Sequence, residues 1–208
     1  YRVHIHQVNA ADYGVPQQRH RVFFIGFRSD LATEWSFPNP THMGDERLTK
    51  LLAKSARSET AQLKNISPWV PLKDAIDDLP TPTAKTPQNW QNHIFQAGAK
   101  SYPGHTGNTL DCPAKALKAG DHGVPGGENM IRYPDGSVRY LTIRESARVQ
   151  TFPDNYVFLG SWSEAMRQLG NAVPVKLAEI VGKSVAEALS GQDRKKTQTS
   201  SHEALQSS

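Results

Sequence analysis

The chain reads QQRHRVFFIGF from Gln17 to Phe27. Its apolar part, residues 21–27, is nearly continuous, a pattern typical of a strand that is buried on both faces. Residues 1–8 alternate strand-forming and polar side chains, which predicts a second strand beside the first. We interpret the pair as the edge of a larger sheet, and we expect the rest of that sheet to lie outside this sequence.

Two arginines stand on alternate residues at the start of the buried strand. The simpler interpretation is that these polar side chains mark the mouth of the strand. The alternative is that Arg19 and Arg21 point the same way and form a fixed fork of hydrogen-bond donors. Such a fork would lie at the end of a strand, where α/β folds place their ligands. Taken alone, the stretch favours the simpler interpretation.

Helical patterns occupy most of the other regular segments. Thr142 is an N-cap candidate with Glu145 three residues on, which is the signature of a capping box. Residues 175–189 carry apolar side chains at helical spacing and predict an amphipathic helix. Shorter or weaker helical patterns cover residues 46–62, 71–79 and 163–169. Residues 98–134 are dense in Gly and Pro and predict loops with short strands.

Composition narrows the class of protein. The 208 residues carry a net charge of +4, which is compatible with a polyanionic partner but does not identify one. Cys112 is the single cysteine, so the sequence has no internal disulfide and no cysteine-based zinc site. Apolar runs stay far below the roughly 20 residues that span a bilayer. We expect an intracellular protein, and the opening at Tyr1 without an initiator Met predicts a fragment of a longer chain.

Two further stretches combine polar residues with helix signals. Residues 139–153 read RYLTIRESARVQTFP and fit an ordinary capped helix with solvent-facing arginines. Residues 168–174 read QLGNAVP and fit a simple turn before the last helix. An Asn in such a turn can also present its amide and the neighbouring backbone N–H groups to a ligand. The second stretch alone is open to both interpretations.

The order and spacing of these stretches resemble the late motifs of the DNA cytosine-5 methyltransferases. The family's eighth motif, Gln-x-Arg-x-Arg at the start of a strand, is matched by Gln17, Arg19 and Arg21. Its ninth motif is matched almost without gaps over residues 139–153. Its tenth, Gly-Asn-x-Val-Pro, is matched by Gly170, Asn171, Val173 and Pro174. Residues 36–133 then correspond to the family's variable target-recognition region.

The resemblance implies an α/β fold. We expect the C-terminal portion of a Rossmann-like S-adenosylmethionine-dependent methyltransferase domain, joined to a small, irregular, β-rich target-recognition domain. Residues 1–35 would end the catalytic domain and residues 36–164 would form the small domain. Residues 165–189 would form a helix that returns to the catalytic domain, and residues 190–208 a disordered tail.

The family's chemistry gives the matched residues supporting roles. A cysteine thiolate attacks C6 of a flipped-out cytosine while a glutamate supports protonation at N3, and C5 then takes the methyl group of S-adenosylmethionine. By this resemblance Arg21 donates to the flipped base near its O2, and Arg19 braces the loop that carries the nucleophile. Asn171, Ala172 and Val173 line the side of the pocket that faces the cofactor and that loop. No metal is implied.

The residues that carry the family's central steps are missing from this sequence. It contains no Phe-x-Gly-x-Gly cofactor loop, no Pro-Cys-Gln and no Glu-Asn-Val. Cys112 precedes a proline instead of following one and lies in the recognition region, so we expect a structural or surface thiol. Activity is then expected only with a complementary N-terminal half. The alternative is a non-catalytic DNA-binding subunit or remnant.

The DNA-reading residues are expected in a glycine-rich stretch of the recognition region. Glycines let the backbone approach DNA closely, and basic or amide side chains offer donors to bases and phosphates. The candidates are Lys118, Gly120, His122, Gly123, Gly126, Gly127 and Asn129. Outside the family frame, the same stretch is a flexible surface loop. The implied setting is the bacterial cytoplasm, on nucleoid DNA and without a membrane, with double-stranded DNA as partner in a restriction-modification system.

Overall fold

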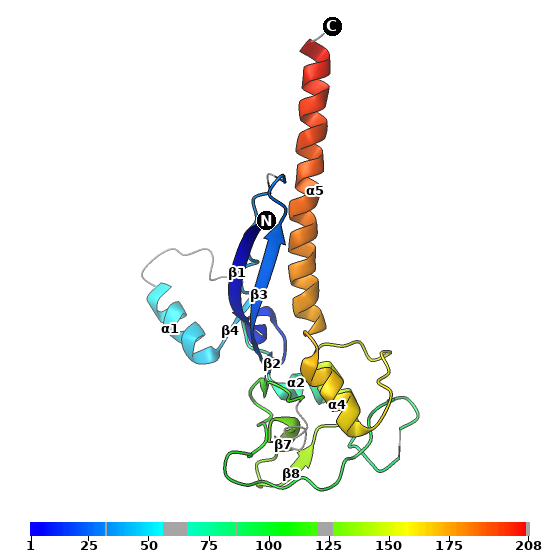
Figure 1. The fold of residues 1–208 in the computed structure, drawn as a ribbon. Coiled ribbons are helices and arrows are strands. Elements are labelled where there is room, and N and C mark those ends of the chain that lie inside the picture. Colours follow the sequence, from blue (N-terminus) through cyan, green and yellow to red (C-terminus); the bar gives the residue numbers. More distant parts are fainter. Residues whose placement is uncertain (32, 56–65, 86, 120–126, 207–208) are drawn as a thin grey trace.

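The structure is a computed structural model that describes residues 1–31, 33–55, 66–85, 87–119 and 127–206; for residues 51–55 and 191–206 it describes the backbone alone. Figure 1 shows an upper part, in which two long strands lie beside the last helix. Below it lies a part made of short strands, short helices and loops.

The upper part is built on one antiparallel pair of strands. β1 (Arg2–Asn9) pairs with β3 (His20–Phe27), with Arg2 opposite Phe27 and Asn9 opposite His20. A 3-10 helix, η1 (Ala10–Tyr13), begins the connection between the two strands. The prediction of two neighbouring strands at the start of the chain is therefore confirmed.

Helix α5 (Val175–Gln206) covers one face of this strand pair. Leu177 and Val181 of the helix share an apolar cluster with Val8 of β1, and Phe23 of β3 packs against that cluster. The apolar stripe predicted over residues 175–189 thus packs against the first strands of the same chain.

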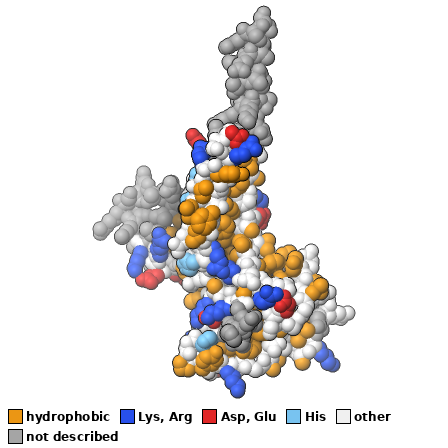
Figure 2. Space-filling model, viewed as in Figure 1, with side chains coloured by type: hydrophobic (Ala, Val, Ile, Leu, Met, Phe, Trp, Pro, Cys, Tyr) orange, Lys and Arg blue, Asp and Glu red, His pale blue; other side chains and the backbone are white. Residues whose placement is uncertain are grey.

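The opposite face of the strand pair is exposed. Successive side chains of a strand point to opposite faces, and this face carries Val3 (57% exposed), Ile5 (62%), Val22 (50%) and Phe24 (68%). Figure 2 shows apolar side chains gathered over β1 and β3. The prediction that residues 21–27 are buried on both faces is wrong in this structure, because the described residues cover one face only.

The other strands of the described residues are two or three residues long. β2 (Gln17–Gln18) is parallel to β6 (Ala114–Lys115), and β4 (His42–Met43) is parallel to β5 (Ser67–Pro68). β7 (Met130–Arg132) follows the 3-10 helix η3 (Gly127–Asn129) and is antiparallel to β8 (Val138–Tyr140). Frequent Gly and Pro residues interrupt regular pairing, which accounts for strands this short.

Four helices precede α5 in the described residues. They are α1 (Asp45–Ser55), α2 (Leu72–Ile76), α3 (Ile143–Val149) and α4 (Trp162–Asn171). α2, α3 and α4 share one apolar core, in which Leu72, Val149 and Leu169 are fully buried. This core fixes where α3 and α4, which carry the ninth and tenth motifs, lie relative to each other.

Helix α3 begins with the predicted capping box. The Thr142 hydroxyl accepts a hydrogen bond from the backbone N of Glu145, and the Glu145 carboxylate accepts one from the backbone N of Thr142. Its arginines are not solvent-facing, however. Arg144 is fully buried and donates to the carbonyl oxygens of Gln91, Pro153 and Tyr156. A buried guanidinium needs such acceptors, because desolvating its donors is costly otherwise.

Helix α5 extends beyond its predicted end at residue 189. The backbone stays helical through Gln206, which differs from the disordered tail expected from residue 190. Extending a helix fixes one residue for each new hydrogen bond, whereas starting one is costly. Residues 190–206 contain no proline that would stop this extension. None of the described helices combines the length and the apolar character needed to cross a membrane.

Candidate functional site

Two residues from different sequence motifs meet through one hydrogen bond. Arg19, just before β3, donates from Nη2 to the carbonyl oxygen of Gly170 at 2.6 Å, across 151 residues of sequence. Gln150, at the end of α3, donates from Nε2 to the carbonyl oxygen of Leu169 at 2.7 Å. Neighbouring carbonyls in the last turn of α4 are thus held by residues of the eighth and ninth motifs, and the three motifs converge there.

Burial governs the electrostatics of Arg19. Its side chain is 1% exposed, and this burial, followed by repulsion from Arg21, lowers the pKa of Arg19 to about 10. Within the described part of the chain, its Nε and Nη1 atoms make no hydrogen bond, and neither do the two amide atoms of the buried Gln17. Unused buried donors are costly. This arrangement fits a role in which Arg19 also braces a further backbone segment.

Gly170 lets the recognition region approach the tenth motif. A Cβ atom at this position would lie 2.8 Å from the backbone N of Ala119 and 2.8 Å from the carbonyl carbon of Lys118. Carbon atoms do not approach other heavy atoms this closely without a shift, so any other residue at position 170 would push the two segments apart. The structure therefore places Lys118, a predicted DNA contact, beside the motif that holds Asn171.

Gln150 and Thr151 hold the start of α5. The backbone N of Val175 donates to the Gln150 carbonyl oxygen at 3.0 Å, and the backbone N of Lys176 donates to the Thr151 hydroxyl at 2.9 Å. Thr151 adopts φ 58°, a left-handed conformation that is strained for a β-branched residue. The sequence gives no signal for this role of Thr151, because a β-branched residue is the last that a turn pattern would assign to positive φ.

The predicted cofactor-facing residues lie directly after this junction. Asn171 is the last residue of α4, and Ala172 follows as its extended C-cap, donating its backbone N–H to the carbonyls of Gln168 and Leu169. Asn171 and Val173 are exposed. Both side chains are therefore accessible to a ligand or to another protein segment.

Arg21 lies at the start of β3 and is exposed. Its Nη1 atom donates to the carbonyl oxygen of His20 at 2.6 Å, a bond to its own neighbour that leaves most of the guanidinium accessible. The structure thus gives the two arginines of the eighth motif different settings: Arg19 is enclosed and Arg21 is open.

The predicted DNA contacts differ in their accessibility. Lys118 forms an ion pair with Glu128 at 3.0 Å and keeps 48% of its side chain exposed. Asn129 is fully buried, and its amide bonds both the backbone N and the carbonyl oxygen of Lys118. Gly127 is buried as well. Gly120, His122, Gly123 and Gly126 lie outside the described residues.

The position of Asn129 corrects the role predicted for it. A DNA contact would require its amide to leave both bonds to Lys118, and buried polar groups would then lose their partners. In this structure the Asn129 side chain is buried and bonded to the backbone of Lys118, so its amide is not presented at the surface. An asparagine looks the same in sequence whether it bonds a base or a backbone, which is why the pattern misassigned it.

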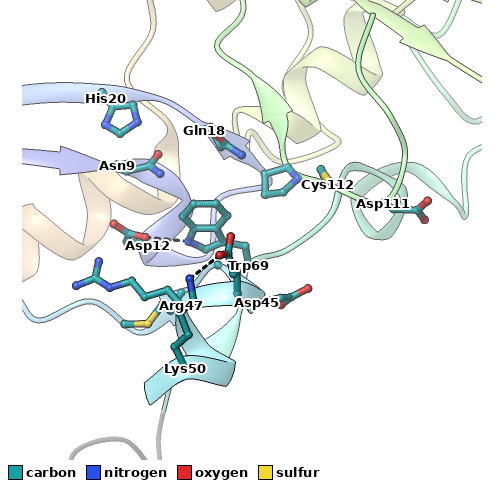
Figure 3. A pocket seen from close by; sticks show the side chains of 14 residues that line it. Asn9, Asp12, Gln18, His20, Asp45, Arg47, Lys50, Trp69, Asp111 and Cys112 are labelled. Carbon is teal, nitrogen blue, oxygen red and sulfur yellow. Dashed lines mark hydrogen bonds and ion pairs between the residues drawn. The ribbon is translucent and has the colours of Figure 1, made fainter. Parts of the chain in front are cut away.

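A pocket of about 720 Å³ lies beside the start of β3 (Figure 3). Gln18 and His20, which alternate with Arg19, line this pocket, and Cys112 lies in its wall. Because alternate strand residues point to opposite sides, Cys112 faces the side of the strand away from Arg19. Its place agrees with a surface thiol and not with a nucleophile braced by Arg19.

Among the residues with described side chains, no group of three His, Cys, Asp or Glu is placed to hold a metal ion.

Comparisons with known proteins identify relatives of the chain. A family model described as C-5 cytosine-specific DNA methylase matches residues 1–187. Type II methyltransferase M.MthTI of Methanothermobacter thermautotrophicus is 31% identical over 216 residues, covering 92% of this chain and 58% of that protein. M.BspRI of Lysinibacillus sphaericus is 32% identical over 206 residues, covering 90% of this chain and 44% of that protein. The chain spans about half the length of the curated relatives it matches.

The fold has a counterpart among solved structures. The crystal structure of the S. pombe Dnmt2 methyltransferase matches with a TM-score of 0.52 at 14% identity, over 90% of this chain and 57% of that one. This likeness supports a methyltransferase fold, and the family uses S-adenosylmethionine as its methyl donor. Because the family model matches nearly the whole chain, and because the three motifs meet at the end of α4, the chain belongs to the C-5 cytosine-specific DNA methylase family.

Proposed function

We propose that this chain is the C-terminal, DNA-recognising part of a DNA cytosine-5 methyltransferase that transfers a methyl group from S-adenosylmethionine to C5 of cytosine. The observation that carries the proposal is the junction at Gly170. There a residue of the eighth motif, Arg19, bonds the tenth motif, and the recognition region passes within contact distance at Ala119. The proposed DNA contact at Lys118 and the proposed supporting residue Arg19 thus lie beside the same glycine.

The exposed face of β1 and β3 supports a requirement for a complementary part. Val3, Ile5, Val22 and Phe24 lie side by side on this face, and burying one such side chain contributes about 1.5–3 kcal/mol. The chain spans 58% of M.MthTI, so the relatives contain sequence beyond the matched region. A part that covers this face and brings the nucleophile and the general acid would complete the enzyme.

The residues of the site then take distinct roles. Arg21 donates to the flipped cytosine as negative charge develops on the ring after attack at C6. Arg19, with unused donors at Nε and Nη1, holds both Gly170 and the loop that carries the nucleophile. Asn171, Ala172 and Val173 contact the cofactor side, where S-adenosylmethionine supplies an electrophilic methyl group when bound. The exposed polar side chain of Asn171 and the exposed apolar side chain of Val173 fit a ligand that has both an amino-acid part and a nucleoside part.

Double-stranded DNA is the proposed partner of the recognition region. Lys118 is held beside the tenth motif by the Gly170 contact, so a phosphate or base bound there would lie close to the reaction. The mild positive charge of the chain agrees with such a partner. Gly120, His122, Gly123 and Gly126 remain predicted contacts.

A second candidate function is a DNA-binding subunit without catalysis. The observation that favours it is the position of Cys112, the single cysteine, on the side of the strand away from Arg19. Both candidates predict DNA binding by the chain. They differ in whether any complementary part restores methyl transfer.

Co-expression with a complementary part tests the proposal. The chain is combined with the portion of M.MthTI that it does not match, and incorporation of labelled methyl groups into duplex DNA is measured. We expect transfer by the pair and none by the chain alone. DNA binding without transfer by the pair would favour the non-catalytic subunit, and absence of DNA binding by the chain would overturn both functions. If the chain alone transferred methyl groups and Cys112→Ser abolished this transfer, the supporting role assigned to the chain would be contradicted.

A further inference from the structure

A stacked pair of rings stands on the surface of the lower part. The rings of Tyr102 and His105 are 4.4 Å apart between centroids, with 29° between their planes. Their backbones close a tight turn, because each residue donates its N–H to the carbonyl oxygen of the other. Gly104 makes the turn possible with φ 83°. The Tyr102 side chain, 50% exposed, is therefore presented on a short and ordered support.

The turn is fixed against the recognition stretch. The backbone N of Gly127 donates to Nδ1 of His105 at 3.1 Å. A Cβ atom at position 127 would lie 2.6 Å from the Cα of His105, so only glycine permits this approach. Because Nδ1 accepts a hydrogen bond, the neutral imidazole carries its proton on Nε2. Gly127 thus positions the ring pair and does not itself need to touch DNA.

Three cationic side chains belong to segments that contact the turn of the ring pair or its neighbour Glu128, whose carboxylate also acts electrostatically with His105. Gly107, two residues after His105, accepts a hydrogen bond from Lys115 Nζ at 3.4 Å and lies against Arg132. Glu128, next to Gly127, pairs with Lys118 at 3.0 Å. Lys115, Lys118 and Arg132 are all exposed. Figure 2 shows Lys, Arg and His side chains distributed over this lower part of the molecule.

An exposed aromatic ring with cationic side chains on neighbouring segments has the chemistry of a nucleic-acid contact. Ring faces stack on bases, while nearby cations bind phosphates. A regular duplex hides the faces of its bases, and a flipped, mismatched or missing base exposes them. Resting on the proposed function, we propose that the Tyr102–His105 pair contacts DNA directly and stacks on a base face at an interruption of the duplex.

Binding by the chain itself tests this contact. Fluorescence anisotropy is measured with a labelled duplex, once intact and once with a single mismatch, at one salt concentration. Tyr102→Ala removes the stacking ring and Tyr102→Phe keeps it. Tyr156→Ala is the matched control, because Tyr156 is also 50% exposed but packs against Phe152 and Phe158 at another place in the lower part.

We expect Tyr102→Ala to weaken binding about tenfold, in line with measured losses of base stacking, and to weaken it most for the mismatched duplex. Tyr102→Phe and Tyr156→Ala retain the affinity of the unaltered chain. Photocrosslinking to a duplex with 5-iodouracil beside the mismatch is expected to label Tyr102, which tests the contact without a variant. Equal affinity of Tyr102→Ala and the unaltered chain, or crosslinks confined to other residues, would overturn the inference and leave the proposed function standing. If the unaltered chain bound no DNA, both would fall.

Discussion

The Thr151 hydroxyl accepts a hydrogen bond from the backbone N of Lys176 at 2.9 Å, so a residue 25 positions away caps the first turn of α5. Thr151 does this from φ 58°, a conformation that a β-branched residue adopts only against strain. The strained backbone conformation of Thr151 is what directs its hydroxyl toward the first turn of α5. The start of α5 is the segment that follows Asn171, Ala172 and Val173.

Removing this cap lowers the stability of the protein by an amount that depends on the replacement. Thr151→Ala loses the hydrogen bond and keeps the strain, so we expect a loss of about 1 kcal/mol, within the range known for helix caps. Thr151→Gly loses the bond but relieves the strain, and its loss is smaller. Thr151→Asn tolerates the left-handed backbone and retains an acceptor, so its stability is the highest of the three. Urea unfolding followed by circular dichroism ranks the variants, and a Gly variant less stable than Ala would refute the strain argument.

His42 makes stability depend on pH. Burial, followed by the nearby Lys176, lowers the pKa of His42, while Asp12 acts in the opposite direction more weakly. The Thr41 hydroxyl also contacts its Nδ1 atom at 2.8 Å. The pKa of His42 in the folded chain thus lies below its unfolded value of 6.5, and between these two pKa values the unfolded chain binds more protons than the folded chain. The free energy of unfolding therefore rises with pH up to about 6.5, and this stability is lost as the pH falls toward the folded pKa.

Substitution tests whether His42 causes this pH dependence. In urea unfolding between about pH 5 and 8, His42→Gln is expected to flatten the pH dependence of the unfolding free energy. Lys176→Ala should reduce the slope as well, because it removes a cation that opposes protonation. Lys183→Ala, which removes another exposed lysine of α5, serves as the control for Lys176→Ala and keeps the slope. An unchanged slope in His42→Gln would show that another group titrates.

The contrast between Arg21 and Lys118 separates chemistry from binding in the assembled enzyme. Arg21 is proposed to act once the ring has been attacked, so Arg21→Ala should lower the single-turnover rate about 100-fold, as loss of a transition-state donor does. Its effect on duplex affinity should be small. Lys118→Ala should weaken DNA binding, by about 1–3 kcal/mol at the correct site if it contacts a base, or equally for all sequences if it contacts a phosphate.

The single-turnover rate and the duplex affinity are measured at the same salt concentration, because the strength of phosphate contacts depends on salt. Lys183→Ala, which breaks an exposed ion pair on α5, is the control and should change neither quantity. The reverse pattern, with Arg21→Ala losing only affinity and Lys118→Ala losing only turnover, would contradict the assigned roles.

The exposed face of β1 and β3 should cause self-association of the chain without its complement. Contiguous apolar side chains on a surface favour contact with one another. Phe24→Glu places a charge in the middle of this face, so its sedimentation coefficient at high concentration should fall toward that of a monomer. Leu189→Glu adds the same charge to an exposed apolar position of α5 and should leave association unchanged. A compact monomer of the unaltered chain at high concentration would argue against the docking face.

Local patterns predicted local structure well in this chain. The capping box of Thr142 and Glu145 needs only residues three apart, and it forms as expected. The relation between Arg19 and Gly170 joins residues 151 positions apart, and no local pattern shows it. The family resemblance placed both residues near one site, but it did not reveal that one bonds the other. Long-range contacts of this kind depend on the packing of α3, α4 and the strands together.

Burial was the property hardest to foresee. Asn129 and Arg144 are polar and were expected to face DNA or solvent, yet both are enclosed and bonded to backbone groups. The apolar run of β3 was expected to be enclosed, yet Phe24 is open. The type of a side chain determines the free-energy cost of burying it. The fold determines which neighbouring groups offset that cost by bonding to it. The stacking of Tyr102 on His105 is not visible in the sequence for the same reason, because it depends on the turn that brings the two rings together.

The contact between Gly170 and Ala119 limits how freely recognition regions can be exchanged. A region from a relative could be grafted in place of residues 36–133. Its backbone would have to follow the same path at residues 118 and 119, because a Cβ atom at position 170 would lie only 2.8 Å from the backbone there. A graft with a bulkier or displaced segment there would push on the turn that holds Asn171. Exchange of the proposed recognition region is therefore constrained by one glycine outside the exchanged region, and chimaeras are best designed around that contact.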